Sequence, residues 1–93
     1  MRALTLLSRR GCCLCEGLES RLRAVDLASL ELEIQVIDID APSTAAALKA
    51  RYDLEVPVLA IDGQELPRVS PRLDAEGLRL WLSRQLADQA QAT

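Results

Sequence analysis

Histidine and phenylalanine are absent from this 93-residue sequence, and tryptophan and tyrosine occur once each, as Trp81 and Tyr52. Because the chain has no histidine, a zinc or copper site would have to be built from cysteine thiolates and carboxylates. Apolar residues make up 49% of the sequence and are almost all aliphatic, so we expect a core of leucine, valine, isoleucine and alanine. A chain of this length has room for a single domain, residues 1–93.

Long apolar runs and a dominant charge of one sign are also missing. No run approaches the roughly 20 residues of a membrane helix, and the apolar run after Met1 is too short for a secretory signal. The 11 basic and 14 acidic residues are spread along the chain, giving a net charge of -3. No basic stripe with interleaved aromatic residues is present. We therefore expect a cytoplasmic monomer with no membrane and no nucleic-acid partner.

The three cysteines are clustered as Cys12, Cys13 and Cys15. A secreted disulfide scaffold would show an even, dispersed set, so the pattern argues against that class of protein. A strand-like apolar run, residues 3–7, precedes the cluster, and helically spaced apolar residues follow it: Leu14, Leu18, Leu22 and Val25. In a reducing compartment, a C-x-x-C pair at such a junction is more often catalytic, redox-sensing or metal-binding than structural.

Periodicity and turn residues predict an α/β chain with the order β-α-β-α-β-β-α. Parallel pairing of the first two strands, followed by a hairpin, gives a four-stranded mixed sheet flanked by three helices. The strands are expected at residues 3–7, 32–39, 56–61 and 64–66, and the helices at residues 13–27, from 40–43 to 51, and 74–88.

Several local features refine these expectations. Asp62-Gly63 is a strong signal for a two-residue hairpin turn, and the short strand after it should lie at an edge. Pro42 suits the first turn of the second helix, on which Leu48 and Tyr52 should face inward. The tail, residues 89–93, is expected to fray.

Cys12 and Cys15 have different expected roles. Cys12 stands just before a helix and after Arg9 and Arg10, and both a helix N-terminus and basic neighbours stabilise a thiolate. Cys15 lies one turn further along and should be more buried. We expect Cys12 to attack a substrate disulfide and Cys15 to resolve the resulting mixed disulfide.

Cys13 has no such clear role, because adjacent cysteines rarely form a disulfide with each other. It is interpreted as a solvent-facing bystander. Two functional alternatives remain: an extra thiol for another disulfide or a glutathione adduct, or a ligand of a soft metal. A metal site would need Cys12, Cys13, Cys15 and a carboxylate such as Glu16, or residues from two chains, and we expect none.

The dipeptide Val56-Pro57 opens a run of β-branched residues. Proline removes a hydrogen-bond donor from a strand, so it favours an edge position, a strand start with a trans bond, or a cis bond. A cis bond would free backbone groups for a ligand.

Together these residues resemble the thioredoxin fold, and specifically its short glutaredoxin-like branch. Cys12-x-x-Cys15 after the first strand and Val56-Pro57-Val58 before the hairpin match the two hallmarks of that family. The resemblance covers essentially the whole chain and implies a thioredoxin-like, glutaredoxin-type fold. More narrowly, residues 8–16, 38–40, 51–52 and 56–59 resemble a group of small bacterial glutaredoxin-like proteins.

The resemblance also implies roles for individual residues. Cys12 would be the nucleophile, Cys15 the resolving thiol and Pro57 a cis-proline facing them. Val56 would offer its backbone N–H and C=O to the cysteinyl backbone of a bound thiol substrate.

The chain departs from the glutaredoxin pattern at two places. Cys13 and Leu14 stand where proline and an aromatic residue are usual, and residues 70–74 replace the usual Gly-Gly before an acidic residue. The resemblance implies no tightly bound cofactor, with glutathione as a co-substrate whose carboxylates could meet Arg9, Arg10 and Arg72. Residues 51–52 are interpreted as helix-end packing and solvation.

The leading functional hypothesis is therefore a thiol–disulfide oxidoreductase. Its partners would be a disulfide-containing protein or glutathione, together with a thiol reductant system. One alternative is a redox-sensing or thiol-binding module with little turnover that docks its partner at Val56-Pro57. The other is a cysteine-ligated metal or iron–sulfur carrier.

Overall fold

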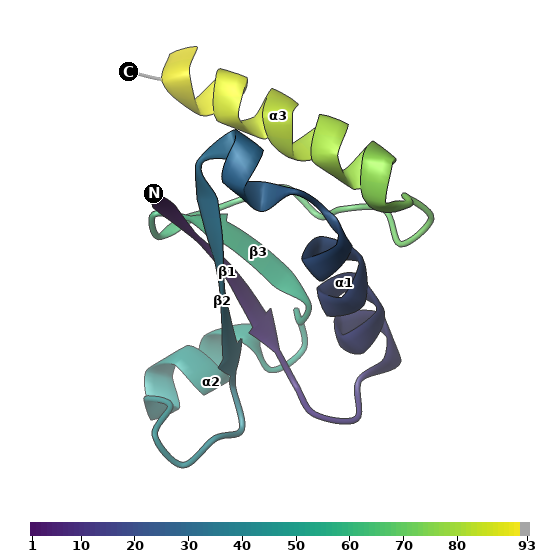
Figure 1. The fold of residues 1–93 in the computed structure, drawn as a ribbon. Coiled ribbons are helices and arrows are strands. Elements are labelled where there is room, and N and C mark those ends of the chain that lie inside the picture. The colour runs from purple at the N-terminus through teal and green to yellow at the C-terminus, as the bar shows by residue number, and fades with distance from the viewer. Residues whose placement is uncertain (92–93) are drawn as a thin grey trace.

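The computed structural model describes residues 1–91, and in that range the elements follow the predicted order, with one added 3-10 helix (Figure 1). The strands form one four-stranded mixed sheet, so the predicted α/β architecture is confirmed. The elements are β1 (Arg2–Ser8), α1 (Cys13–Ala24), the 3-10 helix η1 (Leu27–Leu30), β2 (Leu32–Asp38), α2 (Ala46–Tyr52), β3 (Val58–Ile61), β4 (Gln64–Glu65) and α3 (Ala75–Gln91).

The sheet has the strand order β2-β1-β3-β4, which places β1 inside and the short β4 at an edge. β1 and β2 are parallel, as expected for strands joined through a helix. β3 is antiparallel to β1, with Leu7 opposite Val58. Asp62 and Gly63 join β3 to β4, and their positive φ angles of 51° and 81° are those of a tight hairpin turn. The predicted hairpin is confirmed.

The core is aliphatic and lies between the sheet and two of the helices. α1 and α3 pack together over one face, whereas α2 lies apart from them near the end of β2 (Figure 1). Trp81 packs against the core but is only partly buried. The most deeply buried core side chains on β1, α1 and α3 are Leu4, Leu6, Leu18, Leu22, Leu78 and Leu82.

The first helix differs from its prediction in length and in orientation. It ends at Ala24 instead of residue 27, because Val25 is extended and its N–H donates to the Leu22 carbonyl at 3.1 Å. Leu14, expected inside, is 55% exposed, whereas Cys15 is fully buried. The helix therefore buries the face that contains Cys15 and Leu22, and the inward assignment of Leu14 was wrong.

The second helix begins later than predicted, at Ala46 and not within residues 40–43. The preceding residues instead form turns around Asp38: its carbonyl accepts from the Ala41 N–H at 3.1 Å and from the Thr44 hydroxyl at 2.6 Å. α2 has no fully buried residue, and Leu48 and Tyr52, expected inside, are only half-buried.

The last helix begins after Asp74, whose carboxylate accepts a hydrogen bond from the Gly77 N–H at 2.8 Å, as an N-cap residue does. It continues to Gln91, so residues 89–91 are helical where fraying was expected. Residues 92–93 of the predicted tail lie outside the described residues. Neither α3 nor any other helix within residues 1–91 is long and apolar enough to cross a membrane.

Candidate active site

The loop between β1 and α1 carries the cysteines and has a defined backbone geometry. Gly11 has a φ of 82°, a left-handed conformation that glycine adopts without a steric penalty. Its N–H donates to a Glu16 carboxylate oxygen at 3.0 Å. One residue later, the Cys12 N–H donates to the Arg9 carbonyl at 3.2 Å. These bonds set the direction in which the chain enters α1.

Cys12 occupies the N-cap position of α1, with an extended backbone and a half-buried side chain. Its sulfur accepts a hydrogen bond from the Cys15 backbone N–H at 3.2 Å. An N-cap side chain normally satisfies one of the free N–H groups at a helix start. Here the sulfur of Cys12 has that role.

Cys15 lies one turn further along and its side chain is fully buried. Burial raises the pKa of the Cys15 thiol, and its hydrogen bond with Cys12 raises that pKa further. A backbone hydrogen bond at Arg9 and a side-chain hydrogen bond with Ser8 act in the opposite direction. The two cysteines of the C-x-x-C pair therefore have different surroundings: one at the surface of a helix start, the other in the interior.

Cys13 is the first residue of α1 and is exposed. All three cysteines are free thiols in the structure. Within residues 1–91, no group of three or more cysteine, aspartate or glutamate side chains is arranged to hold a metal ion.

Arg9, expected to bind substrate, is engaged by two carboxylates of the protein. Its guanidinium donates to Asp40 at 2.7 Å and to the side chain of Asp53, and a further bond of 3.1 Å reaches the Asp53 carbonyl. Asp40 also pairs with Lys49 at 3.2 Å. Hydrogen bonds from Arg9 and then from Lys49 lower the pKa of the Asp40 carboxyl. Hydrogen bonds to Asp40 and Asp53 raise the pKa of Arg9. The positive charge of Arg9 is therefore balanced by carboxylates of the protein itself.

The other two arginines assigned to substrate binding are exposed. Within the described part of the chain, neither Arg10 nor Arg72 forms an ion pair. The segment around Arg72 is held in place by Arg21 of α1, which donates to the Pro71 carbonyl at 2.8 Å and to the Leu73 carbonyl at 2.6 Å. Arg10 and Arg72 are thus available to anionic groups, whereas Arg9 is not.

The Val56–Pro57 peptide bond is cis, and both residues are half-buried. They stand just before β3, which begins at Val58 and not at residue 56 as predicted. Because Val58 lies opposite Leu7, the dipeptide belongs to the end of the sheet where β1 leads into the cysteine loop. The Val56 N–H, expected to meet substrate, already donates to the Tyr52 carbonyl at 3.2 Å.

Three side chains of the site had no role assigned from the sequence: Ser8, Asp40 and Asp53. Ser8 is 7% exposed and is the buried polar residue next to the cysteine pair. Its position as a polar residue at the end of an apolar strand, just before the cysteine loop, is a sequence pattern that indicates a role in the site. No sequence pattern indicates the role of the two aspartates, because they contact Arg9 from 31 and 44 residues away.

Comparison with known proteins agrees with this geometry. A strand that leads into a C-x-x-C pair at a helix start, beside a proline before an antiparallel strand, defines the thioredoxin-like class. Residues 3–83 match the family model described as "Glutaredoxin-like domain (DUF836)". The chain therefore belongs to this glutaredoxin-like family, and the resemblance stated from the sequence is confirmed.

A solved structure supports the same assignment. The X-ray structure of the Northeast Structural Genomics target protein XcR50 from X. campestris is 31% identical in sequence and superposes with a TM-score of 0.52. The match covers 87% of this chain and 96% of that one. No curated protein matches the sequence.

Proposed function

We propose that this chain is a thiol–disulfide oxidoreductase in which Cys12 is the nucleophile and Cys15 is the resolving thiol. The observation that carries the proposal is the 3.2 Å hydrogen bond from the Cys15 N–H to the Cys12 sulfur at the start of α1. That bond holds a half-buried sulfur at a helix start, the position that the nucleophile of a C-x-x-C pair requires. The family assignment supports the class of chemistry.

In the first half-reaction the Cys12 thiolate attacks one sulfur of a substrate disulfide. A bond forms between Cys12 and that sulfur, and the substrate S–S bond breaks. The second substrate sulfur leaves as a thiolate and takes a proton from water. The product is a mixed disulfide between Cys12 and the substrate.

In the second half-reaction the Cys15 thiol loses its proton to water, and its thiolate attacks the Cys12 sulfur. Burial and then the hydrogen bond with Cys12 raise the pKa of Cys15, which favours its thiol form before the mixed disulfide forms. Formation of the mixed disulfide removes the negative charge of the attacking Cys12 thiolate. The attack then releases the reduced substrate and leaves a Cys12–Cys15 disulfide. A thiol reductant system, based on glutathione or on a thioredoxin reductase, returns the two electrons.

The substrate contacts follow from the groups that remain free. Val56 lies before β3, and within the described residues no backbone N–H donates to its carbonyl. This carbonyl is therefore available to a substrate N–H beside the disulfide. Arg10 and Arg72 are exposed and could bind the carboxylates of glutathione as a co-substrate. The proposal requires no tightly bound cofactor.

Three single-cysteine substitutions test the proposal. We expect Cys12→Ser to abolish reduction of a peptide–glutathione mixed disulfide. Cys15→Ser should instead accumulate an adduct on Cys12, detectable by mass spectrometry. Cys13→Ser is the matched control, because this neighbouring thiol has no part in either half-reaction, and it should keep wild-type turnover.

Two results would contradict the proposal. The first is undiminished turnover of Cys12→Ser, which would exclude Cys12 as the nucleophile. The second is a wild-type chain in which the Cys12 mixed disulfide persists, so that its bound half of the substrate is never released as a thiol. That second result would identify a thiol-binding module with little turnover.

A further inference from the structure

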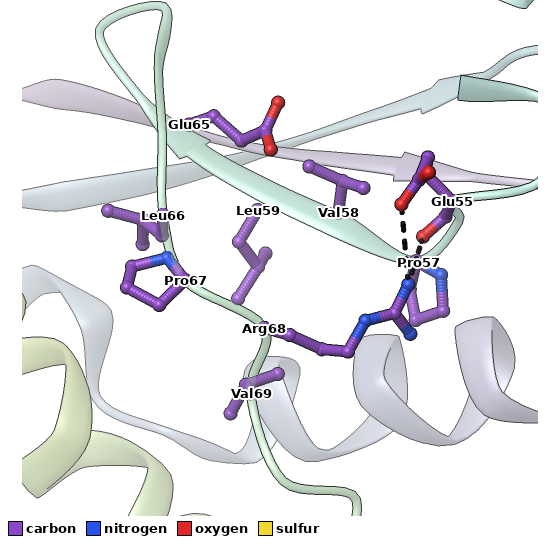
Figure 2. A pocket seen from close by; sticks show the side chains of 9 residues that line it. All are labelled: Glu55, Pro57, Val58, Leu59, Glu65, Leu66, Pro67, Arg68 and Val69. Carbon is purple, nitrogen blue, oxygen red and sulfur yellow. Dashed lines mark hydrogen bonds and ion pairs between the residues drawn. The ribbon is translucent and has the colours of Figure 1, made fainter. Parts of the chain in front are cut away.

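A pocket of about 180 Å³ begins at Pro57, beside the candidate active site (Figure 2). One wall is the start of β3, with Val58 and Leu59. The other is the segment that follows β4 and leads toward α3, including Leu66 and Val69. Figure 2 shows Leu59 on the side of β3 that faces the segment with Arg68 and Val69, and Val58 on the opposite side of the strand. No role in the proposed half-reactions uses this pocket.

The floor of the pocket is apolar. Leu59 and Leu66 are 3% and 6% exposed and belong to the hydrophobic core, and Val69 packs against that core while remaining half-buried. Pro57 adds a further apolar surface on the side of the active site. A ligand group that enters would contact hydrocarbon at the floor and polar groups at the rim, and contact with the floor favours an apolar side chain over a charged one.

The rim is polar, and one part of it is held only by an exposed ion pair. Arg68 extends along the opening toward Glu55, contacting its carbonyl at 3.2 Å and its carboxylate at 3.6 Å (Figure 2). Both side chains are more than half exposed, and an exposed ion pair of this kind contributes roughly 0–1 kcal/mol. A bound ligand group can therefore displace the Arg68 side chain at a free-energy cost of about 1 kcal/mol or less. Glu65 is held more firmly, by Arg51 at 3.3 Å and by the Tyr52 hydroxyl at 3.0 Å.

The position of the pocket relates it to the reacting sulfur. Pro57 is both a wall of the pocket and the neighbour of Val56, whose carbonyl is free for a substrate backbone. An extended peptide advances about 3.3 Å per residue. A residue one or two positions from a cysteine bound beside Val56 would thus lie over the pocket.

We propose that this pocket binds an aliphatic or aromatic side chain that neighbours the disulfide-bonded cysteine of a polypeptide substrate. The inference rests on the proposed function and adds its substrate class: polypeptide disulfides with an apolar flanking residue. The volume suits such a group, since an apolar protein cavity of about 150 Å³ accepts benzene. Glutathione has no apolar side chain, so it would leave the pocket unfilled.

Two activated peptides test the inference on the full chain carrying Cys13→Ser and Cys15→Ser, in which Cys12 is the single thiol. The peptides differ in one residue beside their cysteine, leucine or serine, and each is a mixed disulfide with 5-thio-2-nitrobenzoate. The release rate of that chromophore gives the second-order rate constant of attack by Cys12. We expect the leucine peptide to react roughly tenfold faster or more, because burial of one apolar side chain is worth that factor.

Blocking the pocket should remove this preference. Val69→Phe fills the space from a half-buried position, and the ratio of the two rate constants should fall toward one. Leu80→Phe makes a similar change on α3, at a residue that is 49% exposed and outside the pocket, and should leave the ratio unchanged. If Val69→Phe fails to fold, Arg68→Trp covers the opening from an exposed position and should have the same effect.

The outcomes separate this inference from the proposed function. Equal rate constants for the two peptides in the unblocked protein, or a preference that survives blocking, would overturn the pocket assignment alone. No reaction of either peptide at Cys12 would overturn the proposed function, and the substrate class with it.

Discussion

Two cysteines one helical turn apart differ chemically because of where each sulfur lies. Cys12 caps the helix from its surface end, and Cys15 points into the core beside Ser8. The C-x-x-C spacing alone predicts that the thiols can pair. The position of Cys15 one turn into the helix predicts that it is the more buried thiol, and the structure confirms this prediction.

The buried thiol should make the stability of the reduced protein depend on alkaline pH. The pKa of Cys15 is higher in the folded state than in the unfolded chain, so the unfolded chain loses this proton first as the pH rises. Its contribution to stability is fully present below about pH 8.5 and is lost as the pH rises through the folded-state pKa. Urea unfolding should therefore show the free energy of unfolding falling above about pH 8.5.

Cys15→Ser should remove part of that alkaline fall. The remainder has another source, because burial also raises the pKa of Tyr52, which acts in the same direction. Cys13→Ser is the control at an exposed position and should keep the wild-type profile. Identical profiles for Cys15→Ser and the wild type would show that Cys15 does not titrate as described.

At the scale of elements, Arg9 joins three connecting segments. It belongs to the cysteine loop, Asp40 to the connection between β2 and α2, and Asp53 to the connection between α2 and β3. α2 has no fully buried residue, so core packing does little to hold it. This ion-pair network, extended by Lys49, is what links α2 and the Val56–Pro57 segment to the cysteine loop.

The network should make stability sensitive to acid. Its bonds lower the pKa of the Asp40 carboxyl in the folded state, so the stabilisation is present above about pH 4 and lost as the pH falls through the folded-state pKa. We expect Asp40→Asn to flatten the decline in unfolding free energy between neutral and acidic pH, measured by urea titration. Asp88→Asn, at an exposed position of α3, should leave the decline unchanged. Equal effects of the two substitutions would argue against the network.

At the scale of the whole molecule, stability comes from one aliphatic core between the sheet and the pair α1 and α3. The helical repeat in α1 allowed more than one inward face, because Leu14 and Cys15 are adjacent and both are compatible with burial. Packing against β1 and α3 selected the face with Cys15, which left Leu14 at the surface between Cys13 and Cys15 in the chain.

A pair of leucine substitutions tests that orientation. Leu22 is fully buried, so Leu22→Ala should lower the free energy of unfolding by about 2–5 kcal/mol, through lost burial and the cavity left behind. Leu14→Ala removes the same atoms from a side chain that is 55% exposed and should change it by about 0.5 kcal/mol or less. Chemical denaturation of both variants gives the comparison. Similar losses for the two would mean that α1 is oriented differently.

The sequence by itself determined the order of the elements, the hairpin at Asp62-Gly63 and the cysteine pair at a strand–helix junction, because each depends on neighbouring residues. It also supplied the family resemblance. The tertiary structure decided which face of α1 is buried, the partners of Arg9, the bond that occupies the Val56 N–H and the pocket beside Pro57. All of these depend on packing or on contacts between segments that only folding brings together.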